Sequence, residues 1–73
     1  MTKAQAQALL DALPVERREI TATEHKHRLT REVVGGSASW RGIARWKTTL
    51  GDALRAVVEA AYQQHGVPLP EGR

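Results

Sequence analysis

The stretch SWRGIARWKT, residues 39–48, can be read with two incompatible periods. In a strand, Trp40 and Trp46 face one side of the sheet, while Arg41 and Arg45 face the other side. In a helix this alternation disappears, because side chains three and four positions apart share a face. The period therefore decides whether the basic residues of this stretch form a flat surface or a helical one.

The residues before this stretch favour the strand. Gly35-Gly36 suits a two-residue type I′ turn, because both central positions of that turn need positive φ. A turn there pairs residues outward as far as His25 with Trp46, so two strands agree in phase through one hairpin. Gly42 would also cost about 1 kcal/mol inside a helix. We therefore predict a hairpin closed at Gly35-Gly36.

Directly opposed residues in such a hairpin share a face of the sheet. The apolar face collects Leu29, Val33, Ala38, Trp40, Gly42, Ala44 and Trp46. The other face collects Lys26, Arg28, Thr30, Glu32, Ser39, Arg41, Ile43, Arg45 and Lys47. We expect both tryptophans to be core residues first, although an exposed tryptophan can stack on unpaired bases. Arg31, opposite Trp40, either covers the indole ring or extends to solvent.

A helix remains an alternative for residues 23–34. Thr21-Ala22-Thr23-Glu24 fits a capping box, and Gly35 fits a helix stop. Against the helix, only Leu29 and Val33 pair at i, i+4, and β-forming residues are frequent. Ile20 and Ala22 also alternate with polar neighbours, as in a strand.

Two helices are predicted at the ends of the chain. Thr2 can cap the first, whose apolar face is Ala6, Leu9, Leu10 and Leu13, and Pro14 ends it. Thr49 can cap the second, with Asp52 in its first turn. Its apolar stripe consists of Leu50, Ala53, Leu54, Val57, Val58, Ala61 and Tyr62. Gly66 and Pro68 end it.

Together these elements predict an α+β fold. A small antiparallel three-stranded sheet carries the N-terminal and the C-terminal helix on one face, and its opposite face lies in water. Residues 1–66 form the single small domain, and residues 67–73 form a flexible C-terminal tail.

The composition narrows the class of protein. The chain has 73 residues, 41% of them apolar, which is ordinary for a folded protein but allows only a thin core. It has no Cys, which fits a reducing cytoplasm. The N-terminal residues resemble neither a signal peptide nor a membrane span, so we expect a cytoplasmic protein with no membrane contact. Its net charge of +3 favours an anionic partner, provided that the cations cluster.

The basic sheet face is the strongest functional feature. Arginine guanidinium groups can grip phosphate with two hydrogen bonds, lysines add point charges, and hydroxyl groups add neutral donors. Glu24 and Glu32 share this face and dilute its charge, and a solubilising surface is the plain alternative. The candidate binding residues are Lys26, Arg28, Thr30, Ser39, Arg41, Arg45 and Lys47.

Other chemistry has little support in the sequence. His25 and His27 resemble an HxH metal pair, but a zinc site needs further ligands and only His65, Glu24 or Glu19 are candidates. A partly buried structural histidine is the better interpretation, and we expect no metal and no cofactor. No Ser or Thr lies in a nucleophile turn, and Gly35-Gly36-Ser37 lacks the length and the Lys of a phosphate-binding loop. We therefore expect no enzymatic activity.

The segment WRGIARWKTTLGDALRAVVEA, residues 40–60, is similar in outline to small phage and prophage accessory proteins with a β-hairpin followed by a helix. It also resembles the three-stranded AP2-type and integrase arm-type DNA-binding modules, whose last strand leads into a helix through a Thr-containing turn. The resemblance implies that Arg28, Arg41 and Arg45 read DNA from the exposed sheet face. The N-terminal helix departs from that pattern, as does the missing Gly-aromatic step before the turn.

The sequence thus predicts a small binding protein of a mobile element that contacts nucleic acid through its basic sheet face. The alternative is an inhibitor or adaptor that binds a host protein, for example a phage-encoded antagonist of host defence such as an anti-CRISPR. A homodimer, formed through a strand edge or the apolar helices, is a third possibility.

Overall fold

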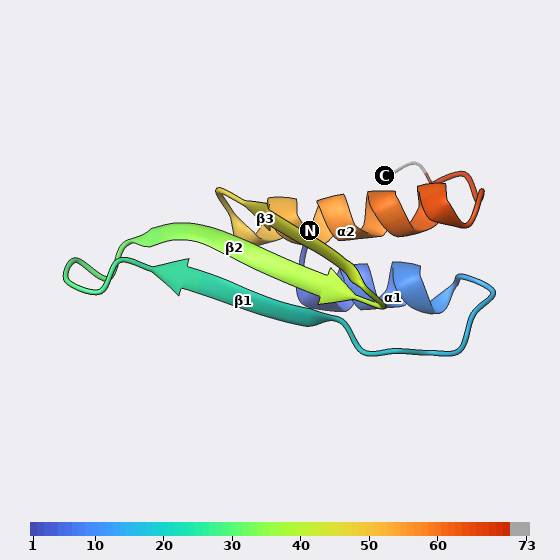
Figure 1. The fold of residues 1–73 in the computed structure, drawn as a ribbon, viewed down its shortest axis with the longest axis horizontal. Helices are drawn as coiled ribbons and strands as arrows, with labels where there is room; N and C mark the ends of the chain where they lie inside the picture. Colours follow the sequence, from blue (N-terminus) through green and yellow to red (C-terminus); the bar gives the residue numbers. More distant parts are fainter. Residues whose placement is uncertain (71–73) are drawn as a thin grey trace.

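A three-stranded antiparallel sheet lies at the centre of the fold, with two helices behind it (Figure 1). The computed structural model describes residues 1–70. In chain order the elements are α1 (Lys3–Asp11), β1 (Thr21–Lys26), β2 (Val33–Trp40), β3 (Ile43–Lys47) and α2 (Leu50–Gln64). The strands lie in the order β1-β2-β3. The predicted α+β fold is confirmed, and residues 21–26 form a strand rather than the start of a helix.

The predicted hairpin turn at Gly35-Gly36 is wrong. Both glycines lie inside β2, the central strand. The chain turns instead at residues 27–32 and at Arg41-Gly42. Arg41 and Gly42 have φ values of 46° and 86°, so both central positions of this two-residue turn have the positive φ that a type I′ turn needs.

Close approaches from both sides of the sheet explain why β2 contains two glycines. A Cβ atom on Gly36 would lie 2.6 Å from the backbone nitrogen of Leu50, at the start of α2. On the opposite face, a Cβ atom on Gly35 would lie 2.5 Å from Cζ2 of Trp46. Both distances are far below van der Waals contact, so each glycine leaves room for a neighbour. The glycines serve packing here, and not a turn.

We expect Gly36→Ala to destabilise the fold more than Gly35→Ala. The alanine at position 36 meets the backbone of α2, which must shift as a unit, and overpacking of this kind costs about 1–3 kcal/mol. The alanine at position 35 meets the end of the exposed Trp46 side chain, which the added methyl group can displace toward solvent, and approaches backbone only at the Lys47 carbonyl, 3.0 Å away. Urea unfolding of both variants measures the difference. Equal losses of stability would show that α2 does not pack against Gly36 as described.

Both helices begin at the predicted caps. The hydroxyl of Thr2 accepts the N–H of Gln5, and the Gln5 side chain accepts the N–H of Thr2, which makes a capping box. The hydroxyl of Thr49 accepts the N–H of Asp52 at the start of α2. No helix within residues 1–70 is long and apolar enough to cross a membrane.

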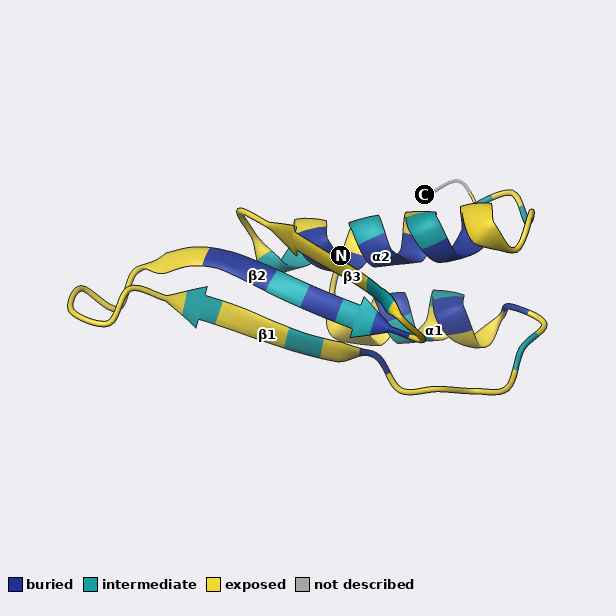
Figure 2. Ribbon diagram, in the orientation of Figure 1, coloured by how far each residue is buried: buried dark blue, intermediate teal, exposed yellow. Residues whose placement is uncertain are grey.

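The core lies between the sheet and the helices, as the dark blue segments of Figure 2 show. Half of its residues come from α2, which contacts all three strands and α1. The buried core residues are Ala6, Leu10, Leu13, Ile20, Ala38, Trp40, Ala53, Leu54, Val57, Val58, Ala61 and Tyr62. The hydroxyl of Tyr62 donates to the carbonyl of Leu9 at 2.6 Å and ties α2 to α1. The stripe predicted on α2 is therefore its buried face.

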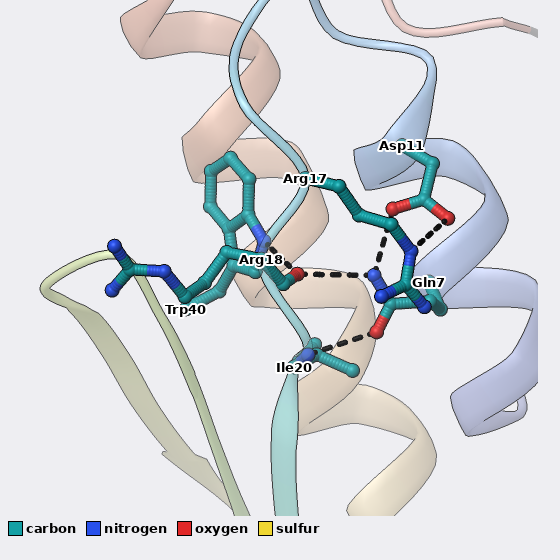
Figure 3. A network of polar contacts seen from close by, with 6 residues as sticks. All are labelled: Gln7, Asp11, Arg17, Arg18, Ile20 and Trp40. Carbon is teal, nitrogen blue, oxygen red and sulfur yellow. Dashed lines mark hydrogen bonds and ion pairs between the residues drawn. The ribbon is translucent and has the colours of Figure 1, made fainter.

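A polar bridge fastens the segment between α1 and β1 (Figure 3). The Gln7 amide accepts the N–H of Ile20 at 2.9 Å and donates to the Arg18 carbonyl at 3.1 Å. Trp40 Nε1 donates to the same carbonyl at 2.9 Å. The Gln7 side chain thus hydrogen-bonds two backbone groups of the segment that leads into β1. These bonds fix the start of β1 against α1.

Three predictions about exposure need correction. Leu29, Val33 and Trp46, expected on the helix-covered face, are 81%, 46% and 57% exposed. The displaced turn is the reason, because it changes which residues lie opposite each other. Within the predicted tail, Val67 and Leu69 are half-buried and pack against the core. Residues 71–73 of that tail lie outside the described residues.

Candidate nucleic-acid interface

The face of the sheet away from the helices carries mostly small and polar side chains. Ala38 and Trp40 are buried toward the helices, so the alternate residues of β2 point away from them. The strand register then assigns the residues that share this side. The open face, as we call it, consists of Thr21, Thr23, His25, Gly35, Ser37, Ser39, Ala44 and Trp46.

The open face forms a shallow hollow of about 300 Å³. Hydroxyl side chains line it from two strands, in the cross-strand pairs Thr21 with Ser39 and Thr23 with Ser37. Trp46 also lines the hollow and is its one aromatic residue, and Arg45 lines it from the edge of the sheet. The face thus offers several hydrogen-bonding groups next to a single large aromatic ring.

Trp46 is held in place by two neighbours. Its ring and the imidazole of His25 are stacked, with centroids 6.0 Å apart and planes 23° apart. His25 is fixed in turn, because its Nε2 is 2.9 Å from the hydroxyl of Ser37. The indole also lies against Gly35, because glycine has no side chain that would occupy the space of the ring. Despite these contacts, Trp46 is 57% exposed.

The hairpin of β1 and β2 projects beyond the helices (Figure 1), and its end is exposed (Figure 2). We call residues 26–34 the hairpin tip. His27 shapes its loop: its N–H donates to the Glu32 carbonyl at 2.8 Å, and its carbonyl accepts the N–H of Arg31 at 2.8 Å. Its Nδ1 also accepts the N–H groups of Leu29 and Thr30. The loop therefore has a defined shape although its side chains lie in water.

Cations gather at this end of the molecule. Lys26, Arg28 and Arg31 belong to the hairpin tip. Lys47 is the last residue of β3 and pairs with Gly36 of β2, at the same end of the sheet. Within residues 1–70 the two ion pairs are Arg17–Asp11 and Arg55–Glu59, so none of these four cations has a carboxylate partner within 4.0 Å. The carboxylates at this end are Glu24 and Glu32. The hairpin tip and its surroundings are therefore net positive.

The structure divides the predicted binding residues among four places. Lys26, Arg28 and Thr30 are in the hairpin tip, and Ser39 is on the open face. Arg41 lies at the other end of the sheet, in the turn to β3. Its guanidinium is 5.6 Å from the centre of the Trp40 ring, so Arg41 rather than Arg31 covers that indole.

Arg45 and Lys47 correct the prediction further. They lie opposite Ala38 and Gly36, so they belong to the helix-covered side, although both are exposed at the sheet edge. Arg45 Nη1 donates to the carbonyl of Ala44 at 2.7 Å and covers part of that edge. The single basic face that the sequence predicts is therefore not formed, because the misplaced turn put these residues in the wrong phase.

Three important residues were missed or misassigned. Trp46 and His25 were expected beneath the helices, and Arg31 was expected to pair with Trp40. The alternation of Thr21, Thr23 and His25 with Ala22 was the one signal in the sequence that could have placed His25 on a polar face.

The HxH pair is divided by the structure. His25 lies on the open face, while His27 is the first residue after β1 and is engaged in the loop. Among residues 1–70, no three His, Asp or Glu side chains lie close enough together to hold a metal ion.

Comparison of the chain with family models, curated proteins and solved structures finds no match.

Proposed function

We propose that the protein is a non-enzymatic nucleic-acid-binding protein that grips phosphates with its hairpin tip. The observation that carries the proposal is the position of Lys26, Arg28 and Arg31 on a projecting hairpin, three cations without carboxylate partners among residues 1–70. An exposed arginine there can offer two parallel N–H donors to one phosphate.

The shape of the hairpin supports the same function. A two-stranded ribbon fits the major groove of duplex DNA, and a loop that projects from the body can follow a backbone without collision of the helices. The internal hydrogen bonds of His27 hold the loop in one conformation, so little ordering remains to be done on binding. The likeness of residues 40–60 to AP2-type and integrase arm-type modules also suggests DNA as the partner, although those modules read it from the sheet face and not from a hairpin tip.

A protein partner is the second candidate, and a specific observation favours it. Leu29 is 81% exposed at the end of the hairpin, and Val33 and Val34 are each nearly half exposed beside it. Apolar side chains in such a position can form the centre of a protein interface, with the arginines at its rim. An inhibitor or adaptor that binds a host protein would use this surface. Such binding would survive moderate salt.

Salt dependence separates the two functions. We expect labelled random duplexes to bind with an affinity that falls linearly in a log–log plot against salt concentration. For the four cations of this end, the slope should be between about −3 and −4 for duplex DNA. Fluorescence anisotropy over a series of salt concentrations measures it. No binding of duplex or single strands at low salt would contradict the proposal and would favour the protein partner.

A further inference from the structure

We infer that the open face binds an unpaired base of a single-stranded nucleic acid, stacked on the exposed surface of Trp46. The inference deepens the proposed function and rests on it, because it names the form of nucleic acid that the protein takes. It uses a different set of residues from the phosphate-binding hairpin tip, so the two can be tested apart.

The exposed position of Trp46 is not explained by a contribution to the stability of the fold. A tryptophan left 57% exposed contributes only part of its area to stability, and an exposed aromatic on an edge strand invites association. Trp40, which is 3% exposed, is the tryptophan of the core, and Trp46 lies outside the core on the open face. The indole on the open face is therefore available for a ligand.

The surrounding residues hold the indole in one orientation. Gly35, in the middle of the central strand, leaves the space that the ring fills, although glycine weakens a strand. His25 stacks beside the ring and is itself anchored to the Ser37 hydroxyl. A ring fixed on two sides loses little conformational entropy when a second ring stacks on it, so the site is preorganised for a flat partner.

The groups near the indole suit the edge of a base. Ser37 lies directly opposite Trp46, and Thr23 lies opposite Ser37. Their hydroxyls are within the same shallow hollow, and each can donate or accept a hydrogen bond. A hollow of about 300 Å³ is at the small end of ligand sites, which is the size expected for one base rather than a larger molecule.

Charge distinguishes a nucleotide from an uncharged ring. Arg45 lines the same hollow as Trp46 and is exposed, so a guanidinium group lies at the margin of the site. The phosphate of a base stacked on Trp46 can meet this guanidinium. In a duplex the faces of the bases are stacked on one another, and a side chain on a sheet cannot reach them. The site therefore selects unpaired segments.

Substitution of Trp46 tests the inference. We expect Trp46→Leu to weaken binding of a short oligothymidine about 10-fold or more, while Trp46→Phe retains most of the affinity. Duplex binding and the salt slope should change little in either variant, because the phosphate contacts remain. Gly35→Ala should weaken oligothymidine binding as well, since it displaces the indole without removing it. Thermal melting confirms that each variant is folded.

An abasic strand of the same length provides the control, because it keeps the phosphates and lacks the bases. The wild type and Trp46→Leu should bind the abasic strand with equal affinity. Oligothymidine should quench the tryptophan fluorescence of the wild type, and the abasic strand should not. Equal oligothymidine affinity of the wild type and Trp46→Leu, with salt-dependent binding intact, would overturn the inference and leave the proposed function standing. Absence of all nucleic-acid binding by the wild type would overturn both.

Discussion

Replacement of Trp40 by alanine is expected to lower the free energy of unfolding by about 3–5 kcal/mol. This loss is comparable with the whole stability of many small domains, so much of the protein should be unfolded without denaturant. Trp40 is 3% exposed, lies in the central strand and makes a T-shaped contact with the His65 ring. Its Nε1 donates to the Arg18 carbonyl, so the alanine also removes a partner from that carbonyl.

Trp46→Ala is the matched control, because it removes the same side chain from the same sheet. Trp46 is exposed on the open face, so we expect it to cost less than about 1 kcal/mol. Urea unfolding followed by circular dichroism measures both changes. Losses of equal size would contradict the strand register, which assigns one tryptophan to the core and the other to the open face.

Much of the fold could be predicted from the sequence, because its helices are marked by local signals. The hydroxyls of Thr2 and Thr49 cap helices that begin directly after them, and Pro14 follows the end of the first. The apolar stripe of α2 also has the period of its helix. Such signals depend on residues within a few positions of each other, so they hold without knowledge of the tertiary structure.

The turn could not be placed, because glycine has two uses. It permits positive φ, as at Gly42, and it permits close approach, as at Gly36 beneath Leu50. The second use depends on a residue fourteen positions away in the chain, which no local pattern reveals. With the turn displaced, every pairing changed, and side chains such as Trp46 moved from the expected face to the other.

The candidate site was likewise predicted only in part. Lys26 and Arg28 were predicted as binding residues because charge is readable from the sequence, and both lie in the hairpin tip that we propose binds phosphates. The aromatic pair of His25 and Trp46 was not found, because it brings β1 and β3 together across Gly35. Its members are twenty-one positions apart, and the expected register hid their common face.

Removal of the tip cations should weaken nucleic-acid binding more than any other change of the same charge. We expect the combined variant Lys26→Gln/Arg28→Gln/Arg31→Gln to make the salt slope shallower by about 2 to 3, which corresponds to the loss of nearly one phosphate contact per residue. The replaced side chains lie in water and have no carboxylate partner within residues 1–70, so the fold should be unaffected.

A second combined variant separates position from total charge. Lys3, Arg18 and Arg55 are exposed on α1, the following segment and α2, away from the hairpin tip. Their replacement by Gln removes the same number of positive charges. If binding depends only on the net charge of the protein, the two variants lose affinity equally.

The salt slope of duplex binding, measured by fluorescence anisotropy for the wild type and these two variants, tests most directly whether the hairpin tip grips phosphates. We predict a steep slope for the wild type, a nearly unchanged slope for the variant at positions 3, 18 and 55, and a shallow slope for the variant at positions 26, 28 and 31. A shallow slope for the variant at positions 3, 18 and 55, with the slope of the hairpin-tip variant unchanged, would contradict the assignment and transfer the phosphate-binding surface to the helices.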